Sequence, residues 1–160
     1  MMRRDSILIL ALTLGAAAAH AQDDAQFVQA AAASGLAEVD LGRLAADRGA
    51  GAEVRGFGQM MVEDHERANR ELAQLAAKKG LALPAAAPDS ARAEFVRLDN
   101  LTGRDFDLTY LRATVSGRER ALALFTEEAQ AGTDPDIKAW AAKTLPSIKG
   151  HLSTARNIQH

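Results

Sequence analysis

Apolar residues recur at spacings of three and four along most of the chain, which is the period of an amphipathic helix. The pattern predicts four long helices, over residues 23–48, 52–79, 104–131 and from 135 to at least 155. Their predicted ends coincide with Gly49-Ala50-Gly51, Gly80 and Gly132, because glycine favours helix termination. The fourth helix is expected to begin at Pro135 with Thr133 or Asp134 as its cap, since proline lacks only a hydrogen bond that is unmade at the first helical position.

The apolar row of each predicted helix identifies the residues expected to face the core. These residues are Phe27, Ala31, Ser34, Glu38, Leu41 and Ala45 in the first helix; Val54, Phe57, Met61, His65, Ala68, Leu72 and Leu75 in the second; Phe106, Tyr110, Thr114, Arg118, Ala121 and Phe125 in the third; and Ile137, Ala141, Thr144 or Leu145, Ile148, His151 or Leu152, and Ala155 in the fourth. We expect Pro146, inside the fourth helix, to bend it.

The segment between the second and third helices is long and contains Pro84 and Pro88. Its part 91–101 is amphipathic and predicts a small helix, capped by Asp89 or Ser90. A connection of this length can cross a bundle from one end to the other. The sequence therefore predicts an all-α, antiparallel four-helix bundle of the ferritin-like type, with a long crossover between the second and third helices.

The first 21 residues resemble a secretory signal peptide. Basic Arg3 and Arg4 precede the apolar run 7–14, and Ala19-His20-Ala21 is an Ala-x-Ala cleavage site before Gln22. The alternative is an uncleaved membrane anchor, but the apolar run is much shorter than the roughly 20 residues that a bilayer span needs. We therefore expect a mature domain over residues 22–160 that is periplasmic or secreted, and no later segment that spans a membrane.

Composition narrows the possible functions. Only 4% of the residues are aromatic and the chain has no cysteine, which suits an alanine-rich helical core and excludes both thiolate chemistry and a lipoprotein anchor. Removal of Arg3, Arg4 and Asp5 with the leader leaves 17 basic and 20 acidic residues, a net charge of about −3. This balance argues against nucleic acid as a partner.

Each predicted helix places one polar or charged residue on its apolar row near its middle: Glu38, His65, Arg118 and His151. One interpretation is a divalent metal site made by Glu38, His65 and His151, with Asp64 as a further ligand. The other is a buried polar cluster in which Glu38 pairs with Arg118 and the imidazoles are hydrogen-bonded, because a buried charge needs a partner.

Two features of the sequence favour the ion pair over a metal or redox centre. Arginine is permanently cationic and repels a metal ion placed beside it. A di-iron centre in such a bundle needs two Glu-x-x-His motifs, whereas the corresponding segments read Val62-Glu63-Asp64-His65 and Ile148-Lys149-Gly150-His151. We therefore assign no catalytic residues, and we expect Met61, Tyr110 and Trp140 to pack in the core.

Several segments, taken in order, resemble the bacterial domain-of-unknown-function family 4142. They are FVQAAAASGLAEVDLGRL at 27–44, VRGFGQMMVEDH at 54–65, AAKKGLALP at 76–84, FDLTYL at 106–111 and KTLPSIKGHLSTA at 143–155. The resemblance covers the whole mature chain. It implies an exported ferritin-like helical bundle, often labelled a membrane or outer-membrane protein, without an established activity.

The resemblance also implies a family site and a departure from it. The family pattern carries the residues matched by Glu38, Asp64, His65 and His151, but in the third helix an Asp-His pair is typical where Gly117-Arg118 stands here. If the family site binds a metal, this chain has lost a ligand. Our hypothesis is that Arg118 supplies the missing positive charge and holds Glu38 by a charge-assisted hydrogen bond.

Two classes of function follow from these observations. The first is a non-enzymatic envelope protein, stress-related or an interaction module, that binds an envelope partner or a small ligand and needs no cofactor. The alternative is a metal-binding or redox protein whose divalent metal lies between the helices. Attachment to a membrane surface ranks below both, because the polar faces lack the basic bias that anionic lipids attract.

Overall fold

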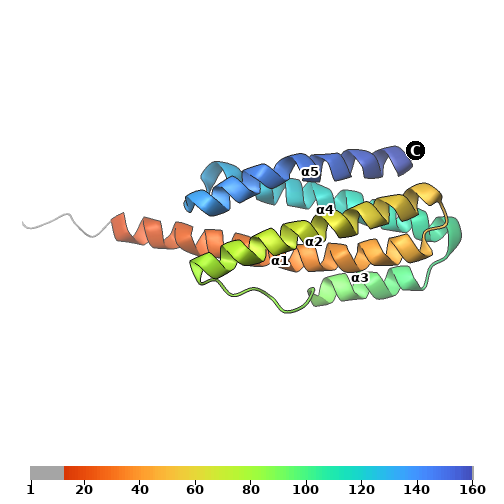
Figure 1. Cartoon of the computed structure of the whole chain (residues 1–160), viewed down its shortest axis with the longest axis horizontal. Helices are drawn as coiled ribbons and strands as arrows, with labels where there is room; N and C mark the ends of the chain where they lie inside the picture. Colours follow the sequence, from red (N-terminus) through yellow and green to blue (C-terminus); the bar gives the residue numbers. More distant parts are fainter. Residues whose placement is uncertain (1–12, 160) are drawn as a thin grey trace, which may run out of the picture.

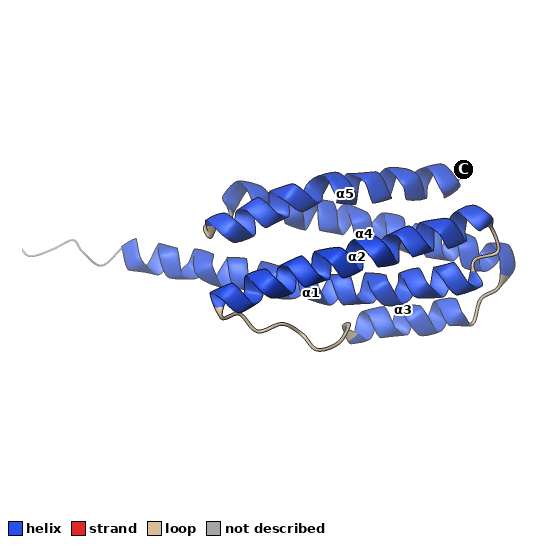
Figure 2. Cartoon of the chain, in the orientation of Figure 1, coloured by secondary structure: helices blue, strands red, loops and turns tan. Residues whose placement is uncertain are grey.

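The computed structural model describes residues 13–159, with side chains from Asp24 onward, and this part of the chain is all-helical. Its five helices are α1 (Thr13–Arg48), α2 (Ala52–Lys79), α3 (Asp89–Asp99), α4 (Gly103–Ala131) and α5 (Pro135–Gln159). The four long helices lie side by side, and α3 runs along the outside near α1 (Figure 1). Loops are confined to two short connections, the turn before α4 and one long segment between α2 and α3 (Figure 2).

The helix bounds agree closely with the pattern of apolar residues. The bounds of α2 match the prediction residue for residue, α4 begins one residue early and α5 begins at Pro135 as expected. The first helix differs, since it begins at Thr13 and not at Asp23. Alanine has the highest helix propensity, and the run 16–19 is all alanine, so helix continues back into the predicted leader.

The predicted signal peptide is only partly within the described chain. Residues 1–12, which include its basic start and most of its apolar run, lie outside the described residues, and residues 13–21 belong to α1. Cleavage near Ala21 and Gln22 stays a prediction. Within the described residues, none of the helices combines the length and the apolar character that crossing a bilayer requires.

Local hydrogen bonds explain where α2 ends and α5 begins. Gly80 adopts a left-handed conformation with φ 67°, and the N–H of Leu81 reaches back to the Ala76 carbonyl at 2.9 Å, which terminates α2. At the start of α5, Asp134 Oδ1 accepts hydrogen bonds from the N–H groups of Asp136 and Ile137 at 3.0 and 3.1 Å. Asp134 is therefore the cap, one of the two residues that the sequence proposed.

Two expectations about single positions are wrong. The short helix α3 begins at Asp89, two residues earlier than expected, so Asp89 and Ser90 lie inside it and cannot cap it. Pro88 occupies the capping position, where its carbonyl accepts from Ala91 and Arg92 at 3.0 and 3.1 Å. Ser34 was expected to face the core but is exposed, because the inward face of α1 passes through Ala31 and Ala32.

The helices pack most closely as two pairs, α1 with α2 and α4 with α5. Glycine permits the closest approach in the first pair: a Cβ atom on Gly58 would lie 2.7 Å from both the Gly42 carbonyl oxygen and the Ala46 nitrogen. The turn between α1 and α2 is held from α4, where the Asp107 carboxylate accepts hydrogen bonds from the N–H groups of Ala50 and Gly51 at 2.9 and 2.8 Å.

The core consists of two hydrophobic clusters. One gathers Phe27, Phe125 and Trp140, whose rings meet with centroids 5.0–6.1 Å apart. The other gathers Phe57, Phe106, Tyr110, Met61 and Leu98. Met61, Tyr110 and Trp140 are thus core residues, as predicted. On each long helix, the two clusters leave a gap near the middle, and the polar inward residues occupy that gap.

Candidate functional site

The five polar residues singled out from the sequence come together between the two hydrophobic clusters. Glu38 lies on α1, Asp64 and His65 on α2, Arg118 on α4 and His151 on α5. We call these five residues the central cluster. Arg118 and His151 are buried with 2% and 5% exposure, whereas the Glu38 side chain keeps 12%.

Arg118 is the residue that joins α1 to α2 through the cluster. Its Nη2 donates to Glu38 Oε1, and its Nη1 lies 3.1 Å from His65 Nε2. A guanidinium can only donate, so His65 Nε2 must accept and the ring proton must sit on Nδ1. Burial lowers the pKa of His65 well below its ordinary value, and the positive charge of Arg118 lowers it further. His65 is therefore neutral.

His151 and Asp64 form the second half of the central cluster. His151 Nε2 lies 2.8 Å from Asp64 Oδ2, and the other Asp64 oxygen accepts from Arg67. Burial raises the pKa of Asp64, but the hydrogen bonds from His151 and Arg67 outweigh this effect and hold the pKa below its usual value. The two imidazole rings are 5.6 Å apart between centroids. Polar contacts thus extend across all four long helices.

The central cluster is accessible through a small pocket between α2, α4 and α5. Its volume is about 90 Å³, and four of the five cluster residues line it together with the charged side chains of Arg67, Glu71 and Lys143. Each of these charges has a partner of opposite sign: Lys143 Nζ lies 2.9 Å from Glu71 Oε2, and Arg67 binds Asp64. The charges of these side chains therefore balance one another.

Two buried nitrogens of the cluster are not satisfied by the part of the chain that the structure describes: Arg118 Nε and His151 Nδ1. A buried polar atom without a partner costs stability unless water or a ligand reaches it. Among the side chains that the structure describes, from Asp24 to Gln159, no three His, Asp or Glu residues are grouped closely enough to hold a metal ion. His65 Nε2 faces the Arg118 guanidinium, so it does not converge with Glu38 and His151 on one point.

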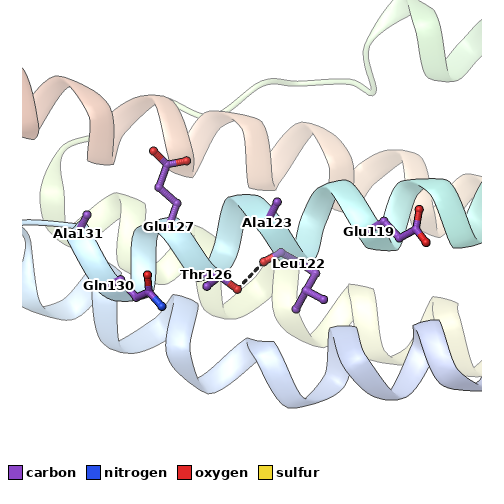
Figure 3. Close-up of a pocket in the computed structure, with 7 residues that line it drawn as sticks. All are labelled: Glu119, Leu122, Ala123, Thr126, Glu127, Gln130 and Ala131. Carbon is purple, nitrogen blue, oxygen red and sulfur yellow. Dashed lines mark hydrogen bonds between the residues drawn. The ribbon is translucent and has the colours of Figure 1, made fainter.

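A larger hollow elsewhere does not qualify as a site. It has a volume of about 470 Å³, and all of the residues that line it come from one stretch of α4 between Glu119 and Ala131. Figure 3 shows these side chains along a single helix, with Thr126 Oγ1 donating to the Leu122 carbonyl at 2.6 Å. Since one helix supplies the whole lining, this hollow is a shallow surface groove.

The sequence analysis did not identify the charged partners of the central cluster, such as Arg67, or a second pair of buried polar residues. Arg67 could have been found from its spacing, because residues i and i+3 on a helix are neighbours and Asp64 precedes it by three. Asp24 and Glu128 are also buried, with 4% and 6% exposure, and they lie in the first third of α1 and near the end of α4. Neither belongs to a predicted apolar row, so the pattern gave no signal for them.

Comparisons with known proteins place the fold and the family. The chain matches no curated protein. It shares its fold with the crystal structure of a DUF305 fragment from Deinococcus radiodurans, with a TM-score of 0.75 and 18% identity over 86% of this chain and 95% of that one. At this identity the likeness shows the fold alone. A family model described as "Domain of unknown function (DUF4142)" matches residues 10–158. The chain therefore belongs to the DUF4142 family, which confirms the resemblance of its sequence segments.

Proposed function

We propose that this chain is an exported, non-enzymatic helical module of the cell envelope that binds a small ligand or a partner protein. One observation carries the proposal: the Arg118 guanidinium lies between Glu38 and His65. The cation needed to balance Glu38 is therefore part of the chain, and the second imidazole is hydrogen-bonded to Asp64. A site that neutralises itself needs no metal to be stable.

We also propose the finer architecture of an antiparallel four-helix bundle of the ferritin-like type. The hydrophobic cluster around Phe27 takes residues that precede the central cluster on α1 and α5 and residues that follow it on α2 and α4. The other cluster takes residues from the complementary parts of these helices. This alternation is what helices running in opposite directions would give, and the segment from Gly80 to Thr102 supplies the crossover.

The size of the pocket limits what can reach the four cluster residues that line it, whereas Glu38 lines a separate hollow of about 590 Å³ between α1, α3 and α4. A volume of about 90 Å³ accommodates a few water molecules or a small polar ligand. A folded partner would bind the outer faces of the helices. The alternative function, a metal-binding or redox protein, would require His65 and His151 to turn away from Arg118 and Asp64, their present partners.

Metal analysis distinguishes the two functions. The protein is purified from the periplasm without chelators, and its intact mass tests removal of residues 1–21. We expect no stoichiometric metal in the natural chain. Arg118→His removes the repelling cation and adds an imidazole, and we expect it to bind a divalent metal. Arg120→His, on an exposed position of the same helix, is the matched control and should bind none.

The outcomes separate the proposal from the hypothesis about Arg118. Stoichiometric metal in the natural chain, lost in both His65→Gln and His151→Gln, would overturn the proposed function. A metal-free Arg118→His variant would leave the proposed function standing and refute only the idea that Arg118 took the place of a metal ligand.

A further inference from the structure

A second group of buried polar residues lies far from the central cluster, where α1 passes the connection between α4 and α5. Asp24 on α1 is only 4% exposed, and Glu128 near the end of α4 is only 6% exposed. In Figure 1 the α4–α5 connection and the early part of α1 lie at the same end of the molecule. We call Asp24 and Glu128 the carboxyl pair.

Asp24 holds the early part of α1 to the α4–α5 connection through three hydrogen bonds. Its Oδ1 accepts from the Thr133 N–H at 3.0 Å, and its Oδ2 accepts from the Thr133 hydroxyl and the Asp134 N–H, each at 2.7 Å. Burial raises the pKa of Asp24, but these bonds outweigh it, and the pKa lies below its ordinary value. Asp24 is therefore an anion in a fixed position.

Glu128 lines the same hollow as this anion and cannot be ionised beside it without a cost. Burial and the negative charge of Asp24 raise the pKa of Glu128 to about 7. Its Oε1 has no hydrogen-bond partner among the described residues. When Glu128 is protonated, its hydroxyl donates to Asp24; when it is ionised, two carboxylates face each other.

Among the side chains that the structure describes, the charged groups around the pair do not supply a cation to replace the proton. Lys79 on α2 is engaged by Asp134 and Asp136 at 2.7 and 2.8 Å. Lys138 on α5 lowers the pKa of Glu128 only as its weakest influence, and its Nζ donates to the Gln130 carbonyl at 2.9 Å. The titratable groups that face the pair are Glu127 on α4, Asp134 in the connection and Lys138 on α5. Lys79 on α2 and Asp136 on α5 lie behind them, bound to Asp134 and to each other.

We propose that Asp24 and Glu128 share one proton, and that this proton fastens the beginning of α1 to the α4–α5 connection. Loss of the proton above neutral pH sets two carboxylates against each other and loosens the residues that follow the predicted cleavage site. The pair lines a surface hollow of about 480 Å³ with Phe27, Glu127 and Gly132, so solvent has a route for proton exchange. This proton-dependent contact is separate from the proposed function and does not depend on it.

The sign of the pH effect follows from the direction of the shift. The pKa of Glu128 is higher in the folded chain than its ordinary value of 4.5, so the folded state binds the proton more tightly than the unfolded state. The stabilising effect is complete below pH 4.5 and is lost as the pH rises toward 7. The pKa of Asp24 is shifted in the opposite direction, so its contribution to the pH dependence of stability is confined to pH values below 4.

The direct test is the carboxyl titration of Glu128 in the natural chain, read from the side-chain carboxyl ¹³C shift by NMR. We expect a midpoint near 7, and a midpoint near the ordinary 4.5 would overturn the proposal. Amide hydrogen exchange, corrected for intrinsic rates, measures how firmly the early part of α1 is held. Exchange over residues 24–30 should rise by up to about tenfold relative to that of α2 between pH 6 and pH 8.

Glu128→Gln keeps a hydrogen-bond donor and removes the titrating proton, so its exchange over residues 24–30 should not change with pH. The matched control is Glu127→Gln, an exposed neighbour that should behave as the natural chain does. Equal pH dependence in the natural chain and Glu128→Gln would overturn the proposal. So would protection at pH 8 that is restored by Ca²⁺ and removed by a chelator, because the pair would then hold a metal ion.

Discussion

The central cluster and the carboxyl pair meet the same physical problem in two ways. Both put carboxylates in surroundings with little water, where an uncompensated charge is costly. The central cluster balances Glu38 with a guanidinium, which stays protonated at all accessible pH values. The carboxyl pair balances Asp24 with a second acid, so its compensation depends on a proton. The first arrangement is permanent and the second is conditional on pH.

The two sites therefore respond to acid in opposite directions. The pKa of His65 is lowered, so the unfolded chain binds a proton more tightly than the folded chain and the central cluster loses stability as the pH falls below 6.5. The carboxyl pair gains stability over the same change, because the pKa of Glu128 is raised. The same fold thus contains two titrating groups whose effects on stability change in opposite directions with pH.

The largest expected effect comes from removing the permanent cation. Arg118→Met leaves Glu38 partly buried and unpaired, and we expect a loss of about 3 kcal/mol in the free energy of unfolding. The estimate is at the low end for a broken buried pair because Glu38 keeps 12% exposure and can be partly hydrated. Urea denaturation at pH 7 measures it.

A double variant separates the ion pair from simple loss of packing. Arg118→Met with Glu38→Gln removes both charges and should recover stability to within about 1 kcal/mol of the natural chain. If the double variant were as unstable as Arg118→Met alone, packing of the long side chain and not charge balance would explain the loss. Arg120→Met, on the exposed side of α4, should change stability by less than about 0.5 kcal/mol.

The next expected effect concerns the pH dependence of stability, which has opposite signs at the two sites. We compare urea denaturation of the natural chain and His65→Gln between pH 5 and pH 8. The natural chain should lose stability relative to the variant as the pH falls below 6.5, since only the natural chain has an imidazole that must stay neutral when folded. A difference that stays constant across this range would show that His65 is not held neutral.

Most helix bounds and the members of the central cluster were predictable from the sequence, whereas the carboxyl pair was not. The helix bounds follow from apolar periodicity and from Gly80, Pro135 and Asp134, all of which act locally. The central cluster was predictable because its members interrupt apolar rows at the same depth in four helices. The pairing of Glu38 with Arg118 was predicted. The partners of the two imidazoles were not predictable, because side-chain direction across a core depends on the packing of all four helices.

The carboxyl pair escaped prediction because nothing local marks it. Asp24 resembles any acidic residue near a helix start, and Glu128 lies within the ordinary acidic pair Glu127-Glu128. Their burial arises from a contact between residues more than 100 positions apart, made when the α4–α5 connection folds over α1. Similarly, the start of α1 could not be placed at Thr13, because signal-peptide composition and helix propensity give competing boundaries.

The smallest expected effect comes from adding one methyl group beside each site, which measures how much free space surrounds its carboxyl group. At Gly132 a Cβ atom would lie 2.1 Å from Glu128 Oε1 and 2.6 Å from the Glu128 carbonyl oxygen, so side chain and backbone must both move. We expect Gly132→Ala to cost about 1–2 kcal/mol and to displace Glu128 from Asp24. The carboxyl ¹³C midpoint of Glu128 should then move from about 7 toward 4.5.

Gly117→Ala is the matched variant at the central cluster. Its Cβ atom would lie 3.4 Å from Glu38 Oε1, an ordinary contact, and alanine favours the helical conformation by up to about 1 kcal/mol. We therefore expect no loss of stability in urea denaturation. The contrast is informative because both variants place the same group beside a buried carboxyl. If Gly117→Ala were the more damaging of the two, the ion pair at the centre, and not the proton-dependent pair at the end, would be the more tightly constrained site.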